Sequence, residues 1–168
     1  MTGEGVPGRD RDPAGRPRNA RPRDELGRPL PRTAARDVPR VPDDLAVTPA
    51  EAVALGGTML AEGRPFHAHE VFEAVWKSQP GADRELWRGL AQIAVGLTHA
   101  RRGNARGAVT LLRRGAVAVR GHAHEAACVD GIDPGFVAAT AEDLAARIER
   151  DGLAAVPPAD LTLALTGA

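Results

Sequence analysis

From residue 48 onward, apolar residues recur at spacings of three and four, which is the period of an amphipathic α-helix. Each break in this pattern carries residues that are typical of helix ends. Thr48-Pro49 has the form of an N-cap followed by a proline at the first helical position, and Gly103-Asn104 can end one helix and cap the next. The pattern predicts five helices: Pro49 to near Gly63, Pro65 to the Pro80-Gly81 turn, Asp83 to Arg102, residues 105–120, and Asp133-Pro134 to about Arg150.

The chain shows no apolar–polar alternation of useful length, which is the signal of a half-buried strand. Alanine and leucine dominate its apolar residues, and this favours helices over sheets. The connections between the predicted helices are short, which favours antiparallel neighbours. We therefore predict an all-α fold: a compact bundle of about five helices with an Arg/Pro-rich N-terminal extension.

The composition changes near residue 45. Residues 1–49 hold nine of the chain's 14 prolines, which remove backbone donors and disfavour regular structure. This extension is predicted to be either disordered and solvated or draped over the domain through Leu26, Leu30 and Val41. The predicted divisions are residues 1–45 for the extension, 46–152 for the helical bundle domain and 153–168 for a C-terminal tail.

The overall composition argues against several classes of function. Lys+Arg and Asp+Glu are equal at 22 each, so net charge favours neither a nucleic-acid binder nor a membrane-surface protein. Tyrosine is absent and other aromatic residues are few, which argues against stacking platforms for single-stranded nucleic acid. The lone Cys128 can form no internal disulfide, no apolar signal segment is visible, and the longest apolar run, residues 90–97, is far shorter than a membrane span. We expect a soluble cytoplasmic protein.

The stretch PFHAHEVFEAVWKS, residues 65–78, places polar residues beside an apolar helix face. At 100° per residue, the apolar side chains form one arc, and His69 and Glu73 lie at its edge, one turn apart. His67 and Glu70 fall on the outer face, so His67 is predicted to be a surface residue.

The third predicted helix is mostly apolar but carries one narrow polar stripe of Arg88, Gln92 and His99. Polar groups inside a packed protein need partners. His69 and Glu73 can supply them if the second and third helices pack antiparallel. We therefore predict a cluster of His69, Glu73, Arg88, Gln92 and His99.

Three kinds of chemistry are open to this cluster. HEVFE, residues 69–73, is a near miss of the H-E-x-x-H zinc motif, and His69, Glu73 and His99 would make a metal site for zinc, iron or manganese. The same three residues could instead be catalytic without a metal, with Glu73 and a histidine shuttling a proton. The third alternative is a structural network in which Glu73 accepts from Arg88 or a histidine and Gln92 bridges.

A second HAHE, residues 122–125, does not indicate a duplication, because Cys128 takes the place of the second glutamate and the residues after it do not match. We expect His122 and His124 at the surface, with a His124–Cys128 metal pair as the alternative.

FHAHEVFEAVW followed by LWRGLAQIAVGLTHARRGNARGAVTLL resembles the prokaryotic family called domain of unknown function 309. The family pattern is an H-E-x-x-E-x-x-W helix, then a G-L-x-Q helix that leads to H-x-x-R-G-N and G-A. The resemblance covers residues 50–120 well and 131–144 more loosely. The resemblance implies an all-helical bundle and makes the polar cluster the expected site. It implies no particular reaction, because the function of the family is unknown. The matching positions are His69, Glu70, Glu73, Trp76, Gly89, Leu90, Gln92, His99, Gly103, Asn104, Gly107 and Ala108.

Two interpretations of the function follow. The first is a pocket between the second and third helices that binds a small molecule or acts on it, for example by hydrolysis. The second is a helical interaction module, because residues 97–116 look like a tetratricopeptide-type helix pair that recruits a protein partner or forms a homo-oligomer. Nucleic-acid binding through the extension has the least support. The predicted ligand-binding residues of the pocket are Arg88, Gln92, Trp76 and Asn104.

Overall fold

The computed structural model describes residues 22–31, 33–34, 38, 41–42, 44–78, 80–81, 83–123 and 130–167. Within these residues the chain forms five α-helices and no strand, which confirms the predicted all-α bundle. None of the helices in this part of the chain is long and apolar enough to cross a membrane. The helices are α1 (Pro49–Ala61), α2 (Pro65–Ser78), α3 (Arg84–Arg101), α4 (Ala105–Arg120) and α5 (Pro134–Asp151), followed by the short 3-10 helices η1 (Leu153–Ala155) and η2 (Pro158–Asp160).

The helices begin where nearby side chains satisfy free backbone N–H groups. Thr48 and Glu51 form a capping box at the start of α1, in which each side chain accepts from the backbone N–H of the other. The Asn104 side chain accepts a hydrogen bond from the Gly107 N–H at 2.9 Å, and Asp133 caps α5 in the same way. Each cap depends on residues only three positions apart, which is why the sequence predicts the helix boundaries closely.

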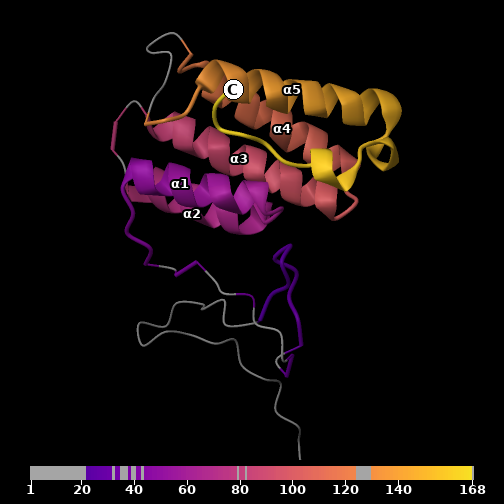
Figure 1. The fold of residues 1–168 in the computed structure, drawn as a ribbon, viewed down its shortest axis with the longest axis horizontal. Helices are drawn as coiled ribbons and strands as arrows, with labels where there is room; N and C mark the ends of the chain where they lie inside the picture. Colours follow the sequence, from indigo (N-terminus) through magenta and orange to yellow (C-terminus); the bar gives the residue numbers. More distant parts are fainter. Residues whose placement is uncertain are drawn as a thin grey trace, which may run out of the picture.

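Consecutive helices pack against each other in chain order, from α1 against α2 to α4 against α5. Figure 1 shows them stacked side by side, with α5 at one edge of the bundle and α1 and α2 at the other. The central helix, α3, packs on both α2 and α4. Its largest side chains are fully or almost fully buried: Leu86, Trp87, Leu90, Ile93 and Leu97.

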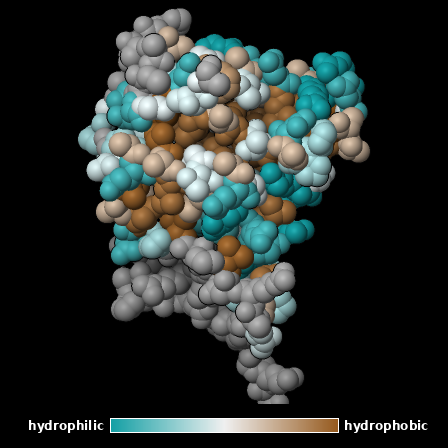
Figure 2. All heavy atoms as spheres, viewed as in Figure 1, coloured by the Kyte–Doolittle hydropathy of each residue, from teal (hydrophilic) through white to brown (hydrophobic). Residues whose placement is uncertain are grey.

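The segment of residues 161–165, yellow in Figure 1, crosses the front of the bundle without regular structure. Leu161, Leu163 and Leu165 are buried in the core. The Thr162 hydroxyl donates to the Leu60 carbonyl oxygen of α1 at 2.8 Å. Apolar residues gather on this face of the molecule in Figure 2. The residues predicted to form a tail therefore contribute side chains to the core.

Residues 22–31, which we call the N-terminal hairpin, fold back on themselves through a bridge between Arg23 and Pro29. The Arg102 guanidinium at the end of α3 donates to the Leu26 carbonyl oxygen, with Nε at 3.0 Å. Gly27 lies against the Phe66 ring at the start of α2, so close that an added Cβ would lie 2.3 Å from the ring. The hairpin thus contacts both α2 and α3. The division of the chain at residues 45 and 152 stays a prediction.

Candidate functional site

The facing sides of α2 and α3 form a pocket of about 230 Å³, which we call the α2–α3 pocket. Five residues singled out by the sequence meet there: His69, Glu73 and Trp76 from α2, and Arg88 and Gln92 from α3. The remaining walls are apolar and consist of Ala91 and Val95 from α3 and Leu111 from α4.

His69 and Glu73 lie next to each other at the edge of the pocket. His69 Nδ1 lies 3.0 Å from the Phe66 carbonyl oxygen. Because a carbonyl oxygen only accepts, Nδ1 carries a hydrogen, and Nε2 is the nitrogen that can take up or release a proton. Nε2 lies 3.6 Å from Glu73 Oε2, and the other oxygen of this carboxylate lies 3.2 Å from Lys77 Nζ.

Three lining residues each hold a buried polar atom that has no hydrogen-bond partner among the described residues: Trp76 Nε1, Arg88 Nε and Gln92 Oε1. Arg88 pairs through Nη2 with Glu85 Oε2 at 3.2 Å, and this leaves its Nε without a partner. The Arg84 guanidinium stacks on the Trp76 ring, with its central carbon 5.0 Å from the ring centroid. A buried polar atom left without a partner costs roughly 1–3 kcal/mol, so three of them in one pocket lining call for an explanation.

His99 and Asn104 lie at the turn between α3 and α4 and do not line the pocket. The Asn104 Nδ2 atom donates to His99 Nδ1 at 2.9 Å, and the same amide caps α4 through its oxygen. His99 comes seven residues after Gln92, or about 10 Å further along the helix axis, which carries it past the pocket. The assignment of His99 and Asn104 as site residues stays a prediction.

No three His, Cys, Asp or Glu side chains in the described ranges are grouped so that they could hold a metal ion. His69 and Glu73 do approach each other, but His99 is engaged at the helix turn. His124 and Cys128, the alternative metal pair, lie outside the described residues. Of the predicted metal triad, His69 and Glu73 are thus the two residues that lie close together in the described part of the chain.

The prediction that His67 lies at the surface is wrong, since this residue is only 2% exposed. Its ring contacts the Phe66 ring edge-on at a centroid distance of 5.7 Å. Both residues lie in the first turn of α2, where Gly27 of the N-terminal hairpin packs on Phe66. Burial lowers the pKa of His67 and the charge of Arg64 lowers it further, against an opposing effect of Glu25. A helical wheel uses the sequence of one helix alone, so it cannot show that a distant segment such as the N-terminal hairpin packs on that helix.

The same prediction fails for His122, which is 9% exposed. This residue follows the end of α4, and its Nδ1 atom lies 3.2 Å from the Ala118 carbonyl oxygen of that helix. The ring therefore folds back onto the last turn of α4 instead of projecting into solvent.

The sequence did not single out Lys77 or the apolar walls of the pocket. Lys77 comes four residues after Glu73, a spacing that predicts an ion pair on one helix face. Ala91 and Val95 share a helix face with the polar stripe of α3, so the helical period was a usable signal for them. Leu111 comes from α4, and only the tertiary packing brings it to the pocket.

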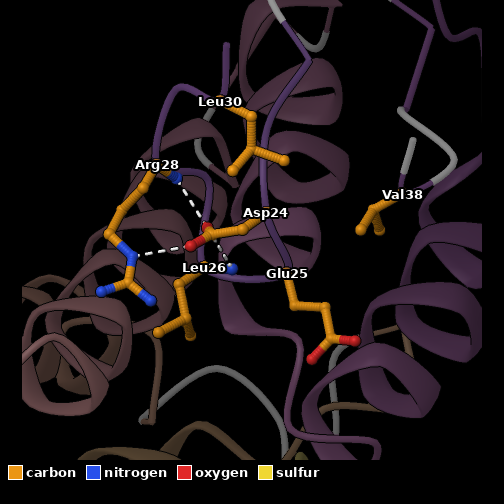
Figure 3. A pocket seen from close by; sticks show the side chains of 6 residues that line it. All are labelled: Asp24, Glu25, Leu26, Arg28, Leu30 and Val38. Atoms are coloured by element: carbon orange, nitrogen blue, oxygen red, sulfur yellow. Dashed lines mark hydrogen bonds and ion pairs between the residues drawn. The ribbon is translucent and has the colours of Figure 1, made fainter. Parts of the chain in front are cut away.

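A second pocket, of about 310 Å³, lies between the N-terminal hairpin and Val38, and Glu25, Leu26 and Leu30 of the hairpin line it (Figure 3). Its central carboxylate is already engaged: Asp24 accepts hydrogen bonds from Arg28 N at 2.8 Å and Arg28 Nε at 2.6 Å. Burial raises the pKa of Asp24, but the hydrogen bonds and charge of Arg28 outweigh it and lower the pKa. These bonds fix the hairpin's own turn, in contrast to the unpartnered atoms of the α2–α3 pocket.

One family model matches the chain, and its description is "Domain of unknown function (DUF309)". The match covers residues 54–111, a range that contains every residue of the α2–α3 pocket lining. The resemblance expected from the sequence is therefore confirmed over this range. No curated protein and no solved structure matches the chain.

Proposed function

We propose that this protein binds a small organic molecule in the α2–α3 pocket, where His69 and Glu73 exchange a proton with it. The observation that carries the proposal is the recess itself, in which the apolar side chains of Ala91, Val95 and Leu111 line the same volume of about 230 Å³ as His69 and Glu73. A mostly apolar recess with a few polar groups is the usual form of a small-molecule site.

The ion pairs around the pocket support a binding role over a structural one. Glu73 pairs with His69 and Lys77 of its own helix, and Arg88 pairs with Glu85 of its own helix. A network that fixed the register of α2 against α3 would instead bond across the two helices. These polar side chains are therefore held in place within each helix and remain available to a molecule between them.

The chemistry that this arrangement can assist is acid–base catalysis. His69 Nε2 can accept a proton from a bound molecule or from water, and the Glu73 carboxylate beside it stabilises the imidazolium that results. Hydrolysis by a water that His69 activates is the reaction class that fits this pair best.

The test is an NMR titration of the ¹⁵N-labelled full chain, because the chain has only two tryptophans. Trp76 lines the pocket, whereas Trp87 is fully buried in the core and serves as an internal reference. The probes are phenol, indole and benzamide at millimolar concentration, the affinity range expected for molecules of this size. We expect the indole N–H signal of Trp76 to move with at least one probe while that of Trp87 stays in place.

A pair of matched variants localises the effect. Ala91→Leu fills the pocket and is expected to abolish the shift of the Trp76 signal, whereas Ala139→Leu, at an exposed position of α5, leaves it unchanged. The proposal fails if no probe moves the Trp76 signal more than the Trp87 signal, or if Ala91→Leu binds as the unaltered chain does.

A further inference from the structure

We infer that Phe66 is a positioning residue of the α2–α3 pocket, which holds the His69 ring in its tautomer and orientation, and that the N-terminal hairpin in turn holds Phe66. The inference rests on the proposed function and names what controls the proton-transfer group of the same site. Residues 22–31 line no part of the pocket, so they would act on its chemistry from a distance.

Phe66 contacts His69 in two ways. The Phe66 carbonyl oxygen lies 3.0 Å from His69 Nδ1, so Nδ1 carries a hydrogen and Nε2 is the free base. The Phe66 ring lies beside the His69 ring, with the centroids 5.4 Å apart and the planes tilted by 48°. The carbonyl selects the tautomer and the ring restricts rotation of the imidazole. Together they direct Nε2 toward the Glu73 carboxylate, whose Oε2 is 3.6 Å away.

The N-terminal hairpin and the end of α3 enclose the Phe66 ring. Arg23 and Arg102 place their guanidinium groups over it, with the central carbons 5.7 Å and 6.0 Å from the ring centroid. Gly27 packs so closely that an added Cβ would lie 2.3 Å from a ring carbon. Arg102 Nε also donates to the Leu26 carbonyl oxygen at 3.0 Å, which joins the hairpin to α3. The position of the Phe66 ring therefore depends on the docked hairpin.

Undocking of the hairpin would change the base that the pocket offers. With the Phe66 ring free to turn away, the half-buried His69 ring can rotate and exchange the Phe66 carbonyl for water. The tautomer with its hydrogen on Nε2 then becomes populated. In that tautomer Nε2 donates, so it cannot take up a proton from a bound molecule. The docked hairpin thus keeps His69 in the form that the proposed chemistry needs.

The test measures the side-chain ¹⁵N chemical shifts of His69 in the ¹⁵N-labelled full chain at mildly alkaline pH. An imidazole nitrogen that carries a hydrogen and one that does not resonate far apart, so the two shifts give the ratio of the tautomers. His69→Gln identifies the His69 signals among those of the five histidines. In the unaltered chain we expect the hydrogen to be on Nδ1.

Two matched glycine variants test the role of the hairpin. Gly27→Ala places a methyl group 2.3 Å from the Phe66 ring at a φ of 74°, so the ring or the hairpin must move. Gly152→Ala has a similar φ of 84°, but its added Cβ meets no described atom within 4 Å. We expect Gly27→Ala to lower the ratio of the Nδ1–H to the Nε2–H tautomer by roughly 3- to 10-fold, the factor that one hydrogen bond provides. Gly152→Ala should leave the ratio unchanged, and the Trp87 indole signal reports that the bundle is intact in both.

A third variant separates the Phe66 ring from its carbonyl. Phe66→Leu keeps the backbone oxygen and removes the ring, and it should lower the tautomer ratio as much as Gly27→Ala does. An unchanged ratio in Phe66→Leu would mean that the carbonyl alone fixes the tautomer, and the inference is then wrong. It is equally wrong if Gly27→Ala and Gly152→Ala give the same ratio.

The outcomes separate this inference from the proposed function, because probe binding at Trp76 is measured independently of the His69 signals. If a probe moves the Trp76 signal but the tautomer ratio responds to neither Gly27→Ala nor Phe66→Leu, the inference is wrong and the binding function stands. If no probe moves the Trp76 signal, the binding function is wrong, and with it the role of Phe66 in proton exchange.

Discussion

On the side that faces α4, α3 comes within backbone contact of its neighbour, whereas on the side that faces α2 it leaves a pocket. Glycines make the first contact possible. A Cβ placed on Gly115 of α4 would lie 2.6 Å from the Gly89 carbonyl oxygen of α3, and one placed on Gly96 would lie 3.0 Å from Leu112. On the other side the side chains of Trp76, Arg88 and Gln92 occupy the space between the helices.

The two sides differ in what they contribute to the free energy of unfolding. The α3–α4 contact buries apolar side chains such as Ile93 and Leu112 at close range, which stabilises the fold. The α2–α3 pocket contains buried polar atoms without partners, which destabilises it. The two sides of α3 therefore make opposite contributions to the free energy of unfolding, and substitutions can separate the two.

The largest effect is expected from Gly115→Ala, which places a methyl group where the two backbones meet. Overpacking of this kind lowers the free energy of unfolding by about 1–3 kcal/mol. Denaturant unfolding measures the change. The matched control is Gly57→Ala in α1, where an added Cβ meets only Leu165 Cδ1 at 3.7 Å. This control should gain roughly 0.5–1 kcal/mol from helix propensity; equal effects at the two glycines would show that the close approach of α3 and α4 does not matter for stability.

A smaller change of opposite sign is expected from Gln92→Leu. The variant removes an unpartnered buried oxygen from the pocket, so the free energy of unfolding should rise by about 1 kcal/mol. Thermal and denaturant unfolding provide the measurement. A loss of stability instead would mean that Gln92 holds the two helices together, as the structural-network alternative requires.

The stability of the α2 side should also depend on pH through His67. Burial holds the pKa of His67 below its ordinary value of 6.5, so the folded chain binds this proton less well than the unfolded chain. Above pH 6.5 neither state of the chain binds this proton, and the stability is at its full value. As the pH falls below 6.5, the unfolded chain takes up the proton first, and the free energy of unfolding decreases. Unfolding measured from neutral to mildly acidic pH should show this fall, and His67→Leu should flatten it. An unchanged slope in the variant would assign the pH dependence to other groups.

The smallest effect is expected from Arg120→Ala, which removes a pair of hydrogen bonds to Glu142 that joins α4 to α5 at 2.7 Å each. Both side chains are substantially exposed, so water and salt screen the pair. We expect a slight loss of stability at low salt that disappears at high salt. A large loss that persists at high salt would show that Arg120 stabilises the contact between α4 and α5 by something other than a screened ion pair.

The sequence predicts what depends on neighbouring residues. Thr48, Asn104 and Asp133 cap helices through bonds three residues long, and a local pattern contains all of that information. The periodicity likewise placed Arg88 and Gln92 on the face of α3 that meets α2.

The errors arise where the tertiary structure decides. A helical wheel gives the face of a helix on which a residue lies, but it does not show which other segments of the chain pack on that face. His67 was placed in solvent because the N-terminal hairpin that contacts the start of α2 comes from residues 22–31. Its contact with Phe66 spans some 40 positions of the sequence, and no local pattern encodes it.

The segment that crosses the bundle has a consequence for the order of events in folding. The hydrogen bond from Thr162 to Leu60 joins residues 102 positions apart, whereas the first four helices are joined by turns of three to five residues. Closing the long loop carries a larger entropic cost than closing the short ones, so the helices should assemble first and the segment should dock last. The same ordering makes this segment the first part of the core to detach in brief local openings, ahead of the contact between α3 and α4.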